Sequence, residues 1–523
     1  MNRRIQIVRT LARQGYNADR EAVTLLTSSE SPTHVIETMA DHLPEDTLRV
    51  TADNVQDALD RLGGEIETSE PITVDPSNVP TPQESTATGE TDQTGVIDSE
   101  SPDPEPTRET SSSTDHHRST HRERGSLTIT GDVTDESTGT GTYETFVQTF
   151  QDRYQRLSGQ LRGRLNHRPA ETLAEMPGQN EAEMIGLVND IQSTKNGHWL
   201  IELEDTTGTF SCLVMKDREI ADTVDELCFD ECIGVAGTLS NDGEILFVDS
   251  IHFPDIPHTY RPSTADRHVR AALISDVHVG SQEFHAAAWE QFTDWLHTEE
   301  AERVEYLLIA GDMVEGVGVY PEQDDELSIV DIYEQYERFS ELLKAVPGDM
   351  EIVMIPGNHD AVRLAEPQPA FDEELRDIMR AHDAHITGNP STVTIEGVSV
   401  LLYHGVSLYE VIIDTPGLDL EHPAEAMCNL LKKRHVAPQY GGQLRLAPEE
   451  RDYLVIDEIP DVFHTGHLHK FGCDSYNNVL AVNSGCWQKQ TSYQRSQGID
   501  PDVGYAPILD LDTHEMTIRK FTV

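Results

Sequence analysis

Six short polar motifs between residues 276 and 485 carry side chains that can bind metal ions. In chain order they are Asp276-Val277-His278, Gly311-Asp312, Gly357-Asn358-His359-Asp360, His404-Gly405, His464-Thr465-Gly466-His467-Leu468-His469 and Asn483-Ser484-Gly485. Two aspartates, one asparagine and several histidines form a mixed oxygen and nitrogen ligand set, which suits Mn, Fe or Zn better than Mg or Ca. The motifs hold enough ligands for two ions.

A pair of metal ions has a defined chemistry. In centres with two ions about 3.5–4 Å apart, one carboxylate commonly bridges them, and the pair activates a water for an in-line displacement at phosphorus. The motifs therefore predict a hydrolase of phosphate esters. Any single motif could be a turn or a structural histidine, but their joint occurrence in this order favours a metal site.

Each motif follows a short apolar run, and these runs must position the ligands. The runs lie at residues 271–275, 306–310, 352–356, 400–403, 462–463 and 479–482. Runs of this length, with helical-length spacers between most of them, are typical of buried strands in an α/β sheet. Ligands bind such sheets at the carboxyl ends of the strands, which is where every motif falls.

The order of the motifs resembles the calcineurin-like metallophosphoesterase superfamily, and no ligand position of that pattern is missing. The resemblance implies that the first metal is held by Asp276, His278, Asp312 and His469, with Asp312 as the bridging ligand. It implies that the second metal is held by Asn358, His404 and His467. His359 would protonate the leaving oxygen or steady the transition state as a general acid, and Asp360 would orient it.

Acidic residues dominate the composition. The 523 residues include 94 acidic and 38 basic side chains, which gives a formal net charge of −56. An acidic excess that extends through folded regions as well as linkers is typical of a solvated halophilic surface. Six cysteines without a signal peptide indicate reduced thiols, and no apolar stretch approaches the ~20 residues that span a membrane. We therefore expect a cytoplasmic protein without membrane contact.

The first 180 residues predict a helical unit, a linker and a connector. Apolar residues recur at helical spacing in residues 1–64, which predicts a small helical domain with a structural or partner-docking role. Residues 65–142 are mainly Ser, Thr, Pro, Gly, Asp and Glu, so they cannot bury enough surface to fold, and we expect a disordered acidic linker. Residues 143–180 are expected to form a helix, with apolar residues at i, i+4 spacing, and a connector.

Residues 181–260 change to the two-residue period of β-strands. Five apolar runs between polar turns predict five antiparallel strands, which is typical of a small barrel of the OB type. OB barrels commonly bind single strands by stacking bases on aromatic side chains. Aromatics are few here and basic residues are nearly absent, so the barrel could equally pack on a neighbouring domain or a partner. The elements expected along the whole sequence predict a multidomain α/β protein. In it, this barrel precedes a calcineurin-like α/β-sandwich phosphoesterase domain at residues 265–523.

The order of these parts is similar to the small subunits of archaeal family-D DNA polymerases. The likeness covers about residues 180–523 and includes the stretches 439–442, 446–449, 460–467 and 482–488. It implies a 3′ to 5′ exonuclease that removes misincorporated nucleotides with two divalent metal ions, expected to be Mn²⁺. It also implies a heterodimer with a larger subunit that carries polymerisation, and DNA with a 3′ end as substrate. A sliding clamp is a further candidate partner.

Two other functions fit the same motifs. A dinuclear phosphatase or phosphodiesterase on a non-DNA substrate uses the same metals, and a non-catalytic scaffold of a polymerase has no need of all seven ligands. DNA-binding proteins usually show a basic stripe, whereas the only basic cluster here is Lys432-Lys433-Arg434-His435. The cations Lys432, Lys433 and Arg434 could line the path of a DNA strand or form a solvated helix end.

Overall fold

The computed structural model describes residues 3–44, 47–67, 125–321, 323–379, 382–442 and 444–522. The predicted N-terminal helical unit consists of four helices, α1 (Arg3–Arg13), α2 (Arg20–Ser28), α3 (Pro32–Ala40) and α4 (Ala52–Glu67). They bury the apolar residues that recur at helical spacing, including Leu11, Leu26 and Val55. Most of the predicted linker, residues 68–124, lies outside the described residues.

The predicted end of the linker at residue 142 is wrong, because the chain forms a strand before it. Strand β3 (Leu127–Gly131) pairs antiparallel with β14 (Ser391–Ile395). The alternation of Leu127 and Ile129 with threonines suits an edge strand, because β-branched residues favour the pleated backbone. Leu127 packs against the interior between the two sheets that the later part of the chain forms. The segment just before the barrel therefore completes a sheet in the domain that follows the barrel.

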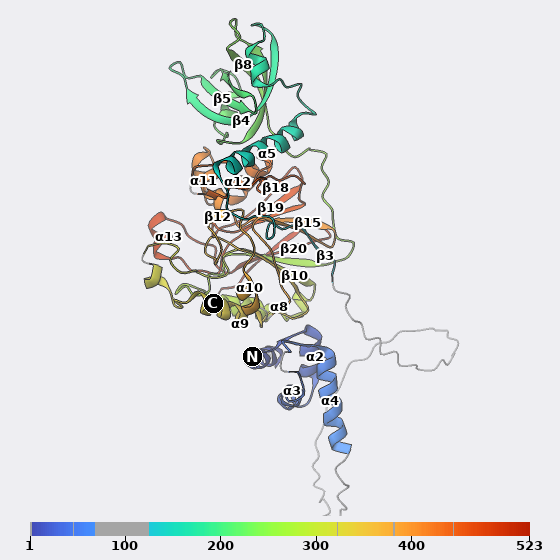
Figure 1. Ribbon diagram of the computed structural model, residues 1–523. Coiled ribbons are helices and arrows are strands. Elements are labelled where there is room, and N and C mark those ends of the chain that lie inside the picture. The colour runs from blue at the N-terminus through green and yellow to red at the C-terminus, as the bar shows by residue number, and fades with distance from the viewer. Residues whose placement is uncertain are drawn as a thin grey trace, which may run out of the picture. The chain divides into compact units, whose positions relative to one another are not determined.

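Residues 143–252 form a helix and a closed barrel (Figure 1). Helix α5 (Tyr143–Leu161) begins at Thr142, whose hydroxyl accepts from the Thr145 amide. The barrel strands follow the order β4-β5-β6-β8-β7. Their bounds are β4 Glu181–Ser193, β5 Trp199–Asp205, β6 Gly208–Val214, β7 Cys232–Leu239 and β8 Ile245–His252. Strands β6 and β8 pair in parallel, so the prediction of five antiparallel strands is wrong for that pair; the OB type stays a prediction.

The remainder of the chain is a sandwich of two six-stranded sheets. The first has the order β13 (His385–Ile386), β11 (Glu351–Ile355), β10 (Val304–Ala310), β9 (Arg270–Ile274), β20 (Tyr505–Asp510) and β21 (Met516–Lys520). The second has the order β18 (Phe471–Tyr476), β19 (Val479–Ser484), β17 (Val462–Thr465), β15 (Val398–Leu402), β14 and β3. The predicted apolar runs are strands of these two sheets, and the multidomain α/β class is confirmed.

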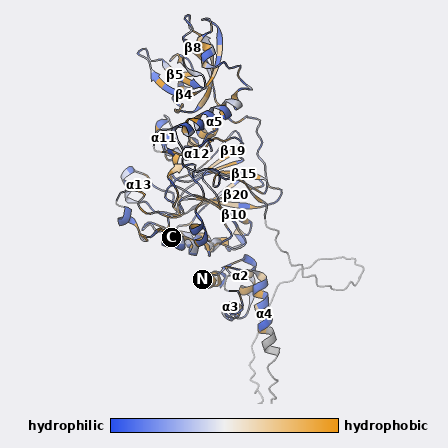
Figure 2. Cartoon of the chain, viewed as in Figure 1, coloured by the Kyte–Doolittle hydropathy of each residue, from blue (hydrophilic) through white to orange (hydrophobic). Residues whose placement is uncertain are grey.

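Alternate residues of the strands face different layers, which is why these runs are apolar throughout. Leu273 and Leu308 join Val400 in the interior between the two sheets. Their neighbours Ile274 and Ile309 pack in a second cluster with helices α8 (Ala286–Leu296) and α9 (Ile332–Leu343). Helices α11 (Val406–Asp414) and α12 (Pro423–Lys433) cover the other sheet. Figure 2 shows both hydrophobic and hydrophilic residues on the helices, as expected where one helix face packs on a sheet and the other faces solvent.

Short elements complete the described chain. They are β1 (Asn17–Ala18), β2 (Arg49–Val50), α6 (Ala170–Ala174), α7 (Ala221–Val224), the 3₁₀ helices Glu299–Ala301 and Gln323–Glu326, β12 (Ala365–Glu366), α10 (Glu373–Ile378), β16 (Arg445–Leu446) and α13 (Ser492–Gln497). Among the described residues, every helix is too short or too polar to cross a bilayer.

Candidate metal centre

The polar motifs meet where strands of both sheets end. Strands β9, β10 and β11 run parallel in one sheet, and β15, β17 and β19 run parallel in the other. The structure brings the predicted ligands into two clusters, in each of which the ligand atoms lie within 4.8 Å of one another. The first cluster is Asp276, His278 and His469, and the second is Asp312, His404 and His467.

The first cluster joins two imidazoles to a carboxylate. His278 Nε2 and His469 Nε2 are 3.0 Å apart. Asp276 Oδ1 lies 3.4 Å from the His469 nitrogen and 3.8 Å from the His278 nitrogen. All three side chains are buried. Two imidazole nitrogens converging on one carboxylate are the donor set that first-row transition metals take in proteins, so this cluster fits a divalent ion.

The second cluster contains the remaining predicted ligands. His404 Nε2 lies 3.2 Å from Asp312 Oδ2 and 3.0 Å from Asn358 Oδ1, and the ring of His467 stacks edge-on at 5.1 Å from that of His404. Asp312 Oδ2 is also 3.8 Å from His278 Nε2 in the first cluster. Asp312 therefore stands between the two clusters, where a carboxylate that bridges two ions would be needed.

The backbone at the ligands is unusual. Five of the predicted ligands have left-handed backbone with positive φ, namely Asp276 (53°), His278 (55°), Asp312 (53°), His467 (69°) and His469 (57°). Residues other than glycine rarely adopt this conformation, and they keep it mainly where the surroundings enforce it, often at functional sites. The turn after each strand thus aims the side chain back over the strand end, at a cost in local stability.

Two glycines let the ligands approach the backbone. A Cβ at Gly357 would collide with the Asp312 carboxylate, and one at Gly466 would collide with the carboxylate of Asp276. These glycines belong to the Gly-Asn-His-Asp and Gly-His-x-His motifs. The motifs therefore require glycine because of packing against the ligands from other strands.

Burial and charge set the protonation of the ligands. Burial opposes ionisation of Asp312, but the charges of His404 and His359 outweigh it and hold the pKa of Asp312 well below its usual range. Burial would lower the pKa of His404, but Asp312 outweighs it and raises this pKa to about 10. Burial and the charge of His404 lower the pKa of His467 to about 3. An ionised carboxylate and a neutral imidazole such as His467 are the forms that bind metal ions.

The catalytic pair predicted by the resemblance is arranged differently from the expectation. The ring of His359 is held by the carbonyl of Glu315, which lies 2.8 Å from Nδ1. Asp360 instead accepts from the Gly357 amide at 2.9 Å and from the Tyr336 hydroxyl at 3.0 Å. Burial, with the charge of Asp312, raises the pKa of the Asp360 carboxyl to about 6. Asp360 therefore fixes the loop that carries His359, and a backbone carbonyl orients the ring.

Three side chains that the sequence analysis did not single out support the first cluster. Glu315 Oε2 lies 2.9 Å from His278 Nδ1, and Gln494 Nε2 lies 2.8 Å from His469 Nδ1. The Gln488 amide donates to Glu315 Oε2 at 2.7 Å. Partners on Nδ1 orient an imidazole and set which nitrogen can bind the metal. Glu315 follows the Gly-Asp motif by three residues, which is a weak sequence signal. Gln488 closes the stretch 482–488, and Gln494 carries no signal.

The basic cluster lies between the barrel and the two-sheet sandwich. The Lys433 ammonium is buried and 2.8 Å from Glu231 Oε2, and Lys432 lies 2.6 Å from Glu226. Arg434 is buried and donates to the backbone carbonyls of Asp255, Ile456 and Asp457. These contacts correct the suggestion that Lys433 and Arg434 line the path of a strand, because buried and paired cations are not available to phosphates. They hold the barrel in place.

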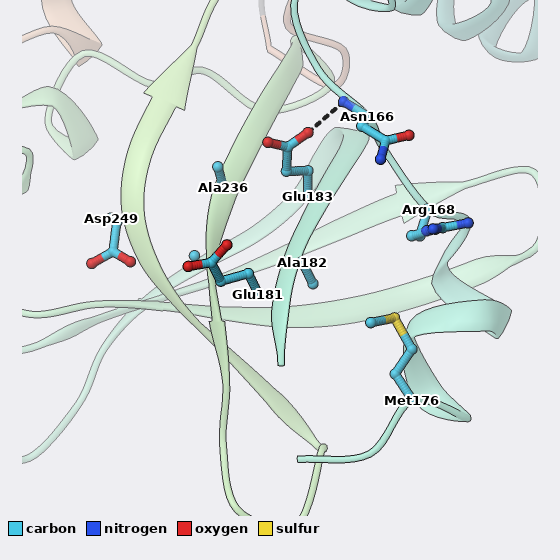
Figure 3. Close-up of a pocket in the computed structure, with 9 residues that line it drawn as sticks. Asn166, Arg168, Met176, Glu181, Ala182, Glu183, Ala236 and Asp249 are labelled. Atoms are coloured by element: carbon cyan, nitrogen blue, oxygen red, sulfur yellow. Dashed lines mark hydrogen bonds between the residues drawn. The ribbon is translucent and has the colours of Figure 1, made fainter. Parts of the chain in front are cut away.

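A hollow of about 350 Å³ lies on the barrel, and its charges are mostly negative (Figure 3). Glu181, Glu183 and Asp249 line it, with Arg168 at its side. The Glu183 carboxylate accepts from the amide of Asn166. Three carboxylates repel phosphate, so this hollow does not suit the backbone of a nucleic acid.

The fold and the site define a multidomain α/β protein in which a two-sheet sandwich carries a candidate centre for two metal ions. Comparison with known proteins is more specific. Residues 271–473 match the family model for the B subunit of DNA polymerases alpha and epsilon. The DNA polymerase II small subunit of Halobacterium salinarum is 59% identical over 522 residues, which cover 99% of both chains. That of Archaeoglobus fulgidus is 42% identical over 72% of this chain and 77% of its own. The chain belongs to the family of archaeal DNA polymerase II small subunits.

Solved structures give weaker likenesses. An archaeal phosphodiesterase is 17% identical with a TM-score of 0.24, covering 48% of this chain and 99% of its own. Vps29 from Entamoeba histolytica in complex with Zn²⁺ is 17% identical with a TM-score of 0.25, covering 48% of this chain and 90% of its own. TM-scores as low as these carry no argument about function.

Proposed function

We propose that this chain is a 3′ to 5′ exonuclease that proofreads DNA within an archaeal DNA polymerase. The observation that supports this proposal is the complete ligand set, whose members converge with Asp312 between the two clusters. Buried carboxylates and left-handed backbone reduce stability. A subunit that served only as a scaffold would have no use for retaining them, which favours an enzyme.

The mechanism rests on the positions of the chain's own residues. Two divalent ions, for which Mn²⁺ is the expected metal, would be held by the seven ligands and would supply an activated water at the phosphodiester. The Glu315 carbonyl can only accept a hydrogen bond, so His359 Nδ1 carries a proton. Delivery of a proton to the leaving 3′ oxygen would come from Nε2 of the doubly protonated ring, which would be left as the neutral imidazole with its proton on Nδ1. Asp360 holds the His359 loop through Tyr336 and the Gly357 amide.

The proposal includes a partner. The relatives are named as small subunits of DNA polymerase II, so we propose a heterodimer in which a larger subunit carries polymerisation. The substrate would be the 3′ end that the larger subunit has just extended. A sliding clamp would meet this assembly as a further partner.

The test uses the full-length chain, alone and with the larger subunit, in Mn²⁺ and high salt. Single-stranded DNA labelled at the 3′ or at the 5′ end is incubated with the wild type and with the variant Asp312→Asn. Asp217→Asn is the matched control, because Asp217 is exposed on the barrel. We expect stepwise shortening from the 3′ end by the wild type and the control, and none by Asp312→Asn.

Other results would favour the other functions. Cleavage of a small phosphodiester without shortening of DNA, in both assemblies, would favour a phosphodiesterase that acts on another substrate. Assembly with the larger subunit without any hydrolysis would favour a scaffold. Equal shortening by the wild type and Asp312→Asn would show that another site cuts the DNA.

A further inference from the structure

The segment from Gln488 to Gly498 links the first cluster to the protein surface. At one end, buried Gln488 donates to Glu315, the residue that contacts His278. Six residues later, buried Gln494 contacts the Nδ1 atom of His469. The same segment therefore supports both imidazoles of the first cluster.

The 488–498 segment is held rigidly. Thr491 and Gln494 form a capping box at the start of helix α13, and the helix ends at Gly498 in left-handed backbone. The side chain of Gln490 donates to the Ile499 carbonyl at 2.7 Å, and the Lys489 amide donates to the Glu283 carbonyl at 2.8 Å. Side chains on this segment consequently have fixed positions relative to the first cluster.

Three exposed side chains on the segment suit a nucleic acid. Tyr493 is 64% exposed, and Lys489 and Arg495 are exposed on either side of it in sequence. Within the described part of the chain, neither cation forms an ion pair, although carboxylates outnumber cations more than twofold in the composition. Lys432 and Lys433, by contrast, are both paired with glutamates.

We propose that the 488–498 segment binds the single-stranded 3′ end of the DNA, with Tyr493 stacking on a base and Lys489 and Arg495 contacting phosphates. This inference rests on the proposed exonuclease function and names the surface that would deliver its substrate. An exposed aromatic ring together with cations on the same segment is the combination that binds single strands without regard to sequence. The contacts of Gln488 and Gln494 place that surface next to the first cluster.

The two kinds of interaction differ in their dependence on salt. The screening length falls to about 3 Å at 1 M salt, and removal of one phosphate contact reduces the salt slope of single-strand binding by about 0.7. Stacking is short-range and keeps its strength. A chain with a formal charge of −56 repels DNA at low salt. At high salt this repulsion and the phosphate contacts are both screened, so Tyr493 would carry most of the affinity.

The test measures binding and cleavage separately in the full-length chain. Binding of a fluorescent single-stranded oligonucleotide is followed by anisotropy with chelator present, across the range of salt in which the protein stays folded. Tyr493→Ala is expected to weaken binding about 5- to 150-fold, the range for losing one stacked base, while Tyr493→Phe binds like the wild type. Lys489→Ala and Arg495→Ala should weaken binding at the lowest salt, and this loss should shrink as salt rises.

Matched controls and a second substrate separate this inference from the proposed function. Tyr143→Ala and Lys195→Ala remove an exposed ring and an exposed cation elsewhere and should bind DNA like the wild type. Hydrolysis of bis-p-nitrophenyl phosphate with Mn²⁺ needs only the metal centre, so Tyr493→Ala should retain it. If the wild type neither cleaves this diester nor shortens DNA, the proposed function is wrong, and the binding data still judge the segment.

Two outcomes would overturn the inference. One is binding of DNA within twofold of the wild type by Tyr493→Ala and by the double variant Lys489→Ala/Arg495→Ala. The other is loss of diester hydrolysis in Tyr493→Ala together with loss in Tyr493→Phe, which would make the ring a structural part of the metal centre. Weaker DNA binding with intact diester hydrolysis supports the inference.

Discussion

Replacement of Glu315 by glutamine is expected to weaken one of the two metal sites and leave the other unchanged. Glu315 Oε2 is 2.9 Å from His278 Nδ1 and accepts from Gln488, and the side chain is buried. Contact with His278 and His359 outweighs burial and lowers the pKa of Glu315 to about 2, so the wild-type partner of His278 is an anion. Glu315→Gln keeps the shape and an acceptor oxygen but removes that charge.

The expected loss of metal affinity follows from the position of Glu315, which contacts the candidate ligand His278. Loss of a residue that orients a metal-binding histidine typically costs 10–100-fold in metal affinity, which corresponds to about 1.4–2.7 kcal/mol. Glu315→Gln can still accept from His278, so we expect a loss near tenfold. Glu315→Ala removes the acceptor altogether, and its loss should approach a hundredfold. In the second cluster, His404 Nδ1 contacts the Ala310 carbonyl at 2.8 Å and not Glu315. We therefore expect the affinity of the second site to stay unchanged.

The assay is a titration of the full-length protein with Mn²⁺, in which the free ion is followed by electron paramagnetic resonance. The wild type should show two sites, and Glu315→Gln should show one weakened site and one of unchanged affinity. Glu334→Gln, an exposed change on helix α9, is the matched control. Superimposable curves for the wild type, Glu315→Gln and Glu315→Ala would refute the role given to Glu315, as would equal weakening of both sites.

Two further changes test the packing around the centre. Arg153→Ala should lower the free energy of unfolding by about 3–5 kcal/mol, measured by denaturant titration, because the buried Asp452 carboxylate loses a guanidinium 2.6 Å away. Arg153 and His435 outweigh burial and hold the pKa of Asp452 below its unfolded value of about 3.9. This stabilisation is thus present above that pH and lost as pH falls below it, so the wild type and Arg153→Ala should differ less at low pH. Gly357→Ala should abolish diester hydrolysis and weaken Mn²⁺ binding, because the added methyl would collide with Asp312; wild-type hydrolysis in Gly357→Ala would contradict the packing argument.

The buried charges around Arg153 connect three parts of the chain. Arg153 lies on helix α5, its carboxylate partner Asp452 belongs to the two-sheet sandwich, and its guanidinium also donates to the Asp230 carbonyl on the barrel. Lys433 and Glu231 form a second buried pair between the same two domains. Removal of one partner from such pairs leaves an uncompensated buried charge. The barrel therefore keeps a defined position on the sandwich that carries the candidate metal centre.

The sequence by itself determined the candidate ligands and the strands that carry them. Short apolar runs indicate buried strands, and a motif of fixed spacing after each run indicates where the strand ends. Both are local properties, because side-chain type and period are read within a few residues. For this reason the side chains that converge in the two clusters, the N-terminal helices and helix α5 could all be predicted without tertiary structure.

Tertiary structure alone decided which polar residues support the centre and which cations face solvent. Glu315 and Gln488 are 173 positions apart, and Lys433 and Glu231 are 202 apart. No local pattern specifies such pairs, because their contact depends on how distant strands and domains pack. The same holds for β3, which joins a sheet in a later domain. A run of three basic residues therefore proved to be mostly buried, whereas the exposed cations beside Tyr493 have no motif that marks them.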